Sequence, residues 1–209
     1  MSEDIKTKLW KSADKLRAQV DPAEYKHIVL GLIFLKYISD KFEAQQEKIR
    51  QMVSDPASDY FISEDVEDYQ SELEERDYYI QDNVFWVPQG ARWTKLRSQA
   101  KQPDIGSIID SAMTLIENDN SSLRGKMDKR FGRQELQEGV LGELIDLIST
   151  VGFSEKYDET DLLGEVYEYF LGQFASAEGK KGGQFYTPAH VVKILVAVLS
   201  PTSGRVYHP

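Results

Sequence analysis

The sequence predicts a mainly α-helical protein, and two observations support this fold class. Several long segments carry apolar residues at helical spacing, and only two short runs in the first 150 residues suggest strands. The chain of 209 residues has 41% hydrophobic and 29% charged residues, the composition of an ordinary globular protein rather than a disordered one. We expect a helical N-terminal bundle over residues 1–150 and the start of a second domain over residues 151–209.

Apolar spacing predicts the first two helices. Residues 3–20 place five apolar side chains on one helical face (Ile5, Leu9, Ala13, Leu16 and Val20). Asp21 and Glu24 resemble the capping box that starts a helix, and we expect this second helix to run to about Met52. Its portion 28–35 is apolar all round, so it belongs at the centre of the bundle.

An acidic stretch and two aromatic runs follow. Residues 55–77 are predicted to be rich in loops. The runs 78–80 and 84–87 contain aromatic and β-branched residues. They form either a small hairpin or extended segments that pack on the bundle. Residues 88–90 end this region.

Three further helices complete the predicted bundle. A short helix covers residues 92–101 and stops before Pro103. Asp104 is predicted to cap the next helix, whose apolar residues recur every three or four positions. A last helix covers residues 134–151, and Gly152 is predicted to cap its C-terminus.

The net charge of −10 is concentrated in one segment. Residues 55–77 hold ten acidic residues and one basic residue, a charge of −9, and the remaining 24 basic and 25 acidic residues carry −1. Such a segment is either a solvated loop or a surface that docks a basic partner. Because it would repel phosphates, we expect it to face away from any bound nucleic acid.

A short basic cluster is the candidate nucleic-acid contact. Five basic residues fall within ten positions and are opposed only by Asp128. They are Arg124, Lys126, Lys129, Arg130 and Arg133. This density either tracks a phosphate backbone or belongs to a solvated helix face or linker. A second set of basic residues is a weaker candidate for nucleic-acid contact, because its members would lie on different sides of a helix (Arg92, Lys95, Arg97 and Lys101).

The composition argues against several other kinds of site. The absence of cysteine excludes disulfides and thiolate metal sites and permits a cytosolic setting. The three histidines, His27, His190 and His208, fit no metal-ligand spacing, so we expect no metal. The N-terminus lacks the apolar region of a signal peptide, and the longest apolar run is far short of the ~20 residues of a membrane span. We therefore expect a cytoplasmic protein that does not contact membranes.

The most informative motif lies near the C-terminus. A basic, glycine-rich loop, residues 180–183, runs into an aromatic pair, and an apolar helix over residues 188–199 follows. Thr187 suits the N-cap of this helix, and Pro188 at its first position lacks only an N–H that would be unpaired anyway. Free N–H groups at such a helix start can bind a carboxylate or phosphate, and the aromatic faces suit an adenine ring. An ordinary capped helix with core aromatics would share these features.

The order of motifs around this segment resembles the modification (HsdM-type) subunit of type I restriction–modification systems. That family consists of DNA adenine N6-methyltransferases that use S-adenosylmethionine. In it, an apolar helix with Gly-x-x-Tyr-Glu-Tyr precedes Gly-Gly-Gln-Phe-Tyr-Thr-Pro, and the first strand of the methyltransferase domain follows. Residues 164–169, 182–188 and 206–207 match these three elements. About 50 residues match well, whereas residues 1–150 fit the family's helical N-terminal domain only in layout.

The resemblance implies a fold, a cofactor and partners. Residues 161–176 and 188–199 would be the first helices of a Rossmann-like S-adenosylmethionine-dependent methyltransferase domain, truncated at its first strand, residues 205–207. Six residues would shape the cofactor site without doing chemistry (Gln184, Phe185, Tyr186, Thr187, Pro188 and Ala189). The partners would be double-stranded DNA, a specificity subunit and a nuclease–translocase subunit. The target adenine would be rotated out of the duplex.

The sequence departs from the family pattern at its end. In the family, Asp-Pro and a glycine-rich turn follow the first strand, but here His208 stands at the aspartate position and Pro209 is the last residue. The family's catalytic Asn-Pro-Pro-aromatic tetrapeptide is also absent. We therefore expect an N-terminal fragment, natural or introduced, that holds no catalytic residue and does not methylate DNA alone. The alternative function is a non-catalytic helical module that clamps DNA or assembles subunits.

Overall fold

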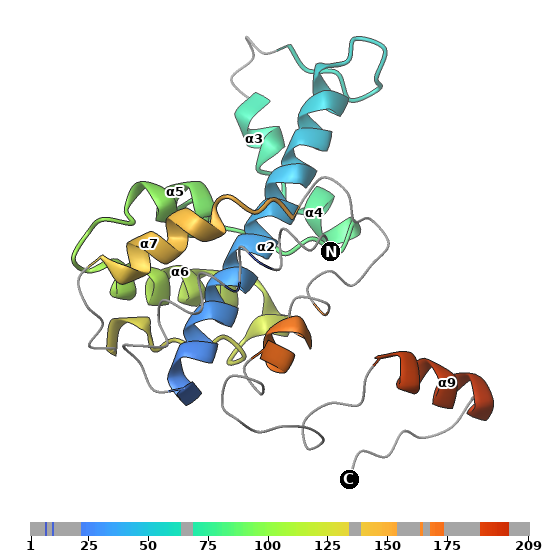
Figure 1. Cartoon of the computed structure of the whole chain (residues 1–209). Coiled ribbons are helices and arrows are strands. Elements are labelled where there is room, and N and C mark those ends of the chain that lie inside the picture. The colour runs from blue at the N-terminus through green and yellow to red at the C-terminus, as the bar shows by residue number, and fades with distance from the viewer. Residues whose placement is uncertain are drawn as a thin grey trace. The chain divides into compact units, whose positions relative to one another are not determined.

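The described part of the chain consists of helices and the segments that connect them (Figure 1). The computed structural model describes residues 7, 10, 22–63, 69–133, 139–153, 164, 168–173 and 189–200. The chain divides into two compact units, Met1–Phe170 and Leu171–Pro209. Within the described ranges every regular element is an α-helix or a short 3-10 helix, which confirms the predicted mainly α fold.

Helix α2 (Pro22–Ser54) runs through the middle of the first unit (Figure 1). It begins one residue after Asp21 and ends two residues beyond the predicted Met52. Nine of its apolar side chains are at most 3% exposed (Ile28, Val29, Leu32, Ile33, Leu35, Ile38, Phe42, Ile49 and Val53). The portion 28–35 lies in the core as predicted, because other helices cover α2 on several sides.

Helices α5 (Trp93–Ser98), α6 (Ile105–Asp119) and α7 (Val140–Ile148) pack together on one side of α2 (Figure 1). The packing between α7 and the turn after α5 is close. A Cβ atom added at Gly142 would lie 2.4 Å from the carbonyl oxygen of Ala100, so only glycine fits at that position.

Hydrogen bonds from buried side chains fix the positions of these helices. The Trp93 backbone N–H donates to Ser39 Oγ on α2 (2.8 Å), and its indole Nε1 donates to Ser149 Oγ after α7 (2.8 Å). Asn120, after α6, accepts a hydrogen bond from the Trp86 N–H (3.0 Å) and donates to the Trp86 carbonyl (2.9 Å). A single residue in each case joins two segments distant in sequence.

A buried ion pair lies in the middle of α2. Lys36 and Asp40, one helical turn apart, are 6% and 7% exposed and hydrogen-bond to each other. Asp40 also accepts a hydrogen bond from the backbone N–H of Phe153 (3.0 Å), and the Lys36 ammonium lies 5.9 Å from the Phe153 ring centre. Burial, followed by the nearby Asp40 carboxylate, raises the pKa of the Glu43 side chain.

Of the two alternatives for residues 78–80 and 84–87, the hairpin is wrong. The other alternative, segments that pack on the bundle without forming a hairpin, holds for residues 84–87, where Trp86 and Val87 are buried. Residues 78–80 belong to a short helix, α4 (Asp77–Gln81), and residues 84–87 lie outside any helix or strand. The physical reason is aromatic packing. Tyr79 stacks on Phe42 (ring centres 4.5 Å apart) and meets Trp86 edge-on (5.1 Å), while Ile80 is 62% exposed. Burial raises the pKa of Tyr79 to about 12.

Two predicted helix caps also differ from the structure. Asp104 precedes α6 but makes no side-chain capping hydrogen bond. Instead of extending to residue 151, α7 ends at Ile148 with Ser149 as its C-cap, and Gly152 does not adopt the left-handed conformation of a capping glycine. A left-handed glycine, Gly139 (φ 86°), precedes α7 at its other end, although the predicted helix began at residue 134.

Other predicted elements are only partly described. Among its described residues, the acidic stretch 55–77 contains the short helix α3 (Tyr69–Leu73) and the first residue of α4. Of the predicted helices 3–20 and 161–176, the structure describes Thr7 and Trp10, and Gly164 and residues 168–173, all helical. Phe170 is fully buried, with its ring centre 6.3 Å from that of Trp10, so Phe170 packs on the N-terminal region. The expected strand 205–207 lies outside the described residues.

The second unit contains helix α9 (Ala189–Leu199), which confirms the predicted apolar helix there. Six of its apolar side chains are between 42% and 77% exposed (Val192, Ile194, Leu195, Val196, Val198 and Leu199). Among the described residues, no helix is long and apolar enough to cross a membrane.

Candidate nucleic-acid interface

The five clustered basic residues lie on a loop after α6, here called the basic loop (residues 124–133). The loop follows a 3-10 helix, η2 (Ser121–Leu123), and ends in another, η3 (Phe131–Arg133). Arg124, Lys126 and Arg133 are exposed, whereas Lys129 and Arg130 are half-buried. The cluster therefore lies on a loop between two 3-10 helices and not on an α-helix face, while the choice between a DNA contact and a solvated linker is not tested by the structure.

Two acidic residues of α6 hold the basic loop in place. One oxygen of the Asp110 carboxylate accepts a hydrogen bond from the Phe131 N–H (3.0 Å), and the other accepts one from the Gly132 N–H (2.9 Å). Glu117, two turns further along α6, accepts a hydrogen bond from the Met127 N–H (2.8 Å). These carboxylates satisfy backbone donors that would otherwise be unpaired at the loop–helix interface.

Glu117 is the more buried of these anchors, at 4% exposure, and it also pairs with the Lys129 ammonium (2.5 Å). Burial by itself raises the pKa of this carboxyl. The hydrogen bonds from Lys129 and from the backbone N–H groups of Met127 and Gly125 together outweigh burial, so the pKa of Glu117 lies below its ordinary value of 4.5. The carboxylate is therefore charged at neutral pH and stabilises the loop.

Apolar contacts fix the same loop from beneath. Phe131 is 2% exposed and its ring packs against Gly31 of α2, where an added Cβ would lie 3.0 Å from the ring. At Gly106, the second residue of α6, an added Cβ would lie 2.5 Å from the Phe131 carbonyl oxygen. Both glycines therefore allow a close approach that a larger residue would prevent.

The loop divides its five basic side chains between two roles. Lys129 pairs with Glu117, and Arg130 pairs with Asp128 (2.6 Å). His27 of α2 also contacts Asp128 (3.1 Å). Arg124, Lys126 and Arg133 form no ion pair with any described residue. These three cations are available to a ligand that carries negative charge.

The predicted cofactor residues are not tested by the structure. Gln184, Phe185, Tyr186, Thr187 and Pro188 lie outside the described residues, and Ala189 is the first residue of α9. Among the described residues, no group of three or more His, Asp or Glu side chains is arranged to hold a metal ion.

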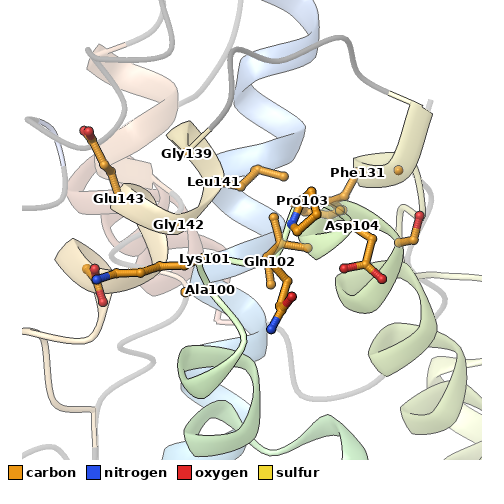
Figure 2. A pocket seen from close by; sticks show the side chains of 15 residues that line it. Ala100, Lys101, Gln102, Pro103, Asp104, Phe131, Gly139, Leu141, Gly142 and Glu143 are labelled. Atoms are coloured by element: carbon orange, nitrogen blue, oxygen red, sulfur yellow. The ribbon is translucent and has the colours of Figure 1, made fainter.

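A cavity of about 520 Å³ lies between the start of α7, which carries Gly139 and Glu143, and the turn before α6, which carries Lys101 and Asp104 (Figure 2). The charged side chains around it are exposed and of both signs, with Asp146 as a third acid. All four of these charged side chains are exposed, so solvent screens them, and we assign no ligand to this cavity.

Sequence analysis missed the residues that give the basic loop its shape. Asp110 and Glu117 are separated from their partners by 10 to 22 residues, and nothing in the sequence marks those pairings. One feature of the sequence could have indicated these anchors. Asp110 and Glu117 lie seven residues apart on one predicted amphipathic helix and therefore on similar faces of it.

Comparison with known proteins relates both parts of the chain to DNA methylases. The family described as the HsdM N-terminal domain matches residues 5–148, and the family described as N-6 DNA Methylase matches residues 158–209. The MjaIX methylase subunit of a type I restriction enzyme from Methanocaldococcus jannaschii is 34% identical over 210 residues, which cover 100% of this chain and 38% of that protein.

A second relative is the HindI methylase subunit of a type I restriction enzyme from Haemophilus influenzae. It is 36% identical over 143 residues, which cover 59% of this chain and 32% of the relative. The chain thus spans about a third of the length of these curated relatives.

A solved structure shares the fold. It is the methyltransferase subunit of a type I restriction–modification system from Streptococcus thermophilus, with a TM-score of 0.66 at 22% identity, over 94% of this chain and 43% of that one. The HsdM N-terminal domain match alone covers more than half of the 209 residues. The chain therefore belongs to the HsdM family, the methylase subunits of type I restriction–modification systems.

Proposed function

We propose that this chain is the N-terminal part of a subunit that transfers a methyl group from S-adenosylmethionine to the N6 atom of adenine in DNA. The observation that carries the proposal is the order of the two family matches, with residues 5–148 in the HsdM N-terminal domain and residues 158–209 in the N-6 DNA Methylase family. The activity would take place in the cytoplasm.

In this function the first unit would contribute DNA contacts through its basic loop. Arg124, Lys126 and Arg133 would contact phosphates, because they are exposed and unpaired among the described residues. Lys129 and Arg130, which the sequence also predicted as DNA contacts, would instead stabilise the loop, because each already forms an ion pair within the protein. Such contacts position the protein on DNA and carry no sequence information.

The cofactor site is proposed at the start of α9. Gln184, Phe185, Tyr186, Thr187, Pro188 and Ala189 would bind S-adenosylmethionine, which supplies the methyl group. The start of α9 at Ala189 supports this, because the first N–H groups of a helix are unpaired and favour a carboxylate such as that of a methionine moiety. The exposed apolar residues of α9 support a methyltransferase domain, in which helices pack on a sheet.

The proposed partners are double-stranded DNA, a specificity subunit that reads the DNA sequence, and a nuclease–translocase subunit. Residues 1–209 alone would not transfer the methyl group, because they contain no Asn-Pro-Pro sequence. Because phosphate contacts by the basic loop would carry no sequence information, the specificity subunit would have to read the base edges.

The decisive experiment is a methyl-transfer assay with the full-length subunit and its specificity subunit. Tritiated S-adenosylmethionine and duplex DNA should yield N6-methyladenine, and residues 1–209 should yield none under the same conditions. Methylation of cytosine, or no methylation by the assembled enzyme, would contradict the proposed function.

The cofactor site can be tested by the substitution Thr187→Ala in the full-length subunit. A purely structural cap would lower the melting temperature equally with and without S-adenosylmethionine. If the helix start faces the cofactor, the substitution should also reduce the rise in melting temperature that the cofactor produces. If the cofactor raised the melting temperature equally in the variant and the wild type, Thr187 would not belong to the cofactor site.

The basic loop can be tested through the salt dependence of DNA binding. Substituting Arg124, Lys126 and Arg133 by Gln should reduce the slope of log K against log salt by about 0.9 for each phosphate that the protein no longer neutralises. The variant Lys129→Gln should lower stability instead, because Lys129 pairs with buried Glu117. If the triple variant and the wild type showed the same slope of log K against log salt, these three side chains would not contact DNA, and the loop would have only a structural role.

A further inference from the structure

A second candidate site is a groove between α2 and the turn that follows α4, on the first unit. It has a volume of about 630 Å³. One wall is a face of α2 that carries Lys41 and Lys48, and the other is the turn that carries Gln81 and Asn83. The groove is separate from the basic loop, which shares none of its lining residues.

Four hydrogen-bond donors of this groove are unoccupied. The side chains of Lys41, Lys48, Gln81 and Asn83 form no hydrogen bond or ion pair with any described residue. Gln81, Asn83 and Lys48 are exposed, and Lys41 is half-buried. Asp82 is the single carboxylate among the lining residues, so the groove carries a net positive charge.

The turn that presents these donors is fixed by hydrogen bonds. Gln45 of α2, only 7% exposed, donates from Nε2 to the Tyr78 carbonyl (3.1 Å) and to the Asp82 carboxylate (2.7 Å). The backbone N–H of Asn83 donates to Ile80 O (3.1 Å). Because Gln45 connects the turn to α2, the two walls of the groove keep their spacing without a ligand.

The spacing of the two lysines points to a polyanion. Lys41 and Lys48 are seven residues apart on one helix, so their Cα atoms are separated by about 10 Å along the axis. Two cations at this spacing, each on a long flexible side chain, can also meet separate negative groups of one extended ligand. One strand of DNA presents such groups in succession, with one phosphate for about every 3.4 Å of duplex axis. Neutral amides such as those of Gln81 and Asn83 commonly complete phosphate contacts.

We propose that this groove binds the sugar–phosphate backbone of duplex DNA, with Lys41 and Lys48 on two phosphates of one strand and the amides of Gln81 and Asn83 between them. This inference rests on the proposed function, because it takes the DNA substrate from there. The groove adds a contact without sequence preference, separate from that of the basic loop.

The test uses the full-length subunit assembled with its specificity subunit, and a duplex that contains the target sequence. The double variant Lys41→Gln, Lys48→Gln should reduce the slope of log K against log salt by up to about 1.8, the value for two phosphates. Its matched control is Lys95→Gln, Lys101→Gln, which removes the same charge from two exposed lysines outside the groove. The control should leave the slope unchanged.

A neutral substitution tests the amide contact. Asn83 has a positive φ of 55°, so Asn83→Gly keeps a conformation that glycine adopts readily and removes only the side-chain donor. This variant should weaken DNA binding several-fold without changing the salt slope, because no charge is removed.

Each outcome bears on the groove or on the proposed function. Equal slopes for the groove variant and the wild type, with methylation intact, would overturn the groove and leave the proposed function standing. Equal flattening by the groove variant and its control would also overturn it, because the effect would then follow net charge. A third outcome is that the groove variant no longer binds the specificity subunit, while the slope of log K against log salt stays unchanged. The groove would then bind an acidic protein segment, and the DNA proposal would be wrong. Failure of the wild-type assembly to bind or methylate DNA would refute the proposed function itself.

Discussion

Replacing Glu117 tests whether this buried carboxylate holds the basic loop. In Glu117→Ala the Met127 N–H loses its acceptor, which costs about 1–3 kcal/mol for a buried donor. Removal of the ion pair with Lys129 adds at most about 1 kcal/mol, because the Lys129 side chain is partly exposed. We therefore expect a loss of about 1–4 kcal/mol in the free energy of unfolding.

The substitution Glu117→Gln separates the two contributions. Its amide oxygen can still accept the hydrogen bond from Met127, so only the charge is removed and we expect about 1 kcal/mol or less. The pKa of Glu117 is lower in the folded state than its ordinary value of 4.5. The charged carboxylate therefore stabilises the fold fully at pH values above 4.5. This stabilisation is lost as the pH falls through the folded-state pKa. The difference between wild type and Glu117→Gln should therefore be present at neutral pH and disappear below pH 4.5.

Urea denaturation followed by tryptophan fluorescence measures both effects, since Trp86 and Trp93 are buried in the same unit. Glu75→Gln, on an exposed turn, is the control and should be nearly neutral. Equal losses for Glu117→Ala and Glu117→Gln, or a difference that persists unchanged in acid, would refute the reasoning.

Three further substitutions have defined outcomes, each measured as the free energy of unfolding. Gly142→Ala should destabilise by several kcal/mol, on the order of a severe core change, because its Cβ would lie 2.4 Å from the Ala100 carbonyl oxygen; a neutral result would contradict the close packing of α7. Asn120→Ala should cost about 1–3 kcal/mol, because it removes a hydrogen bond to a partly buried backbone N–H. Asp40→Ala should cost about 3–5 kcal/mol by leaving the Lys36 ammonium buried and unpaired, and the added change Lys36→Met should restore most of that loss.

Much of the helical fold was predictable from the sequence, because its signal is local. The apolar spacing of α2, α6 and α9 depends on residues within each helix, and their bounds agree with the prediction to within two residues for α2. The prediction failed where distant residues decide the conformation. Residues 78–80 have strand-like composition, but Tyr79 is held in a helical turn by the rings of Phe42 and Trp86.

The candidate sites show the same limit. The density of basic residues pointed to the loop 124–133, but the sequence could not show that Lys129 pairs with Glu117 while Lys126 remains exposed. Lys41 and Lys48 lie on one side of a predicted helix, yet the opposite wall of their groove comes from a turn 33 or more residues later in the chain. Contacts of that range follow from tertiary packing and not from local pattern.

The length of α2 gives the first unit an electrical polarity. At 33 residues it is about 50 Å long. The basic loop packs near its N-terminal end, through Gly31 and His27, and the acidic stretch begins at Asp55, directly after its last residue. The helix macrodipole has the same direction, positive at the N-terminal end and negative at the C-terminal end. In the field of a polyanion such as DNA, this unit would experience a torque that turns the basic end toward the phosphates before any contact forms.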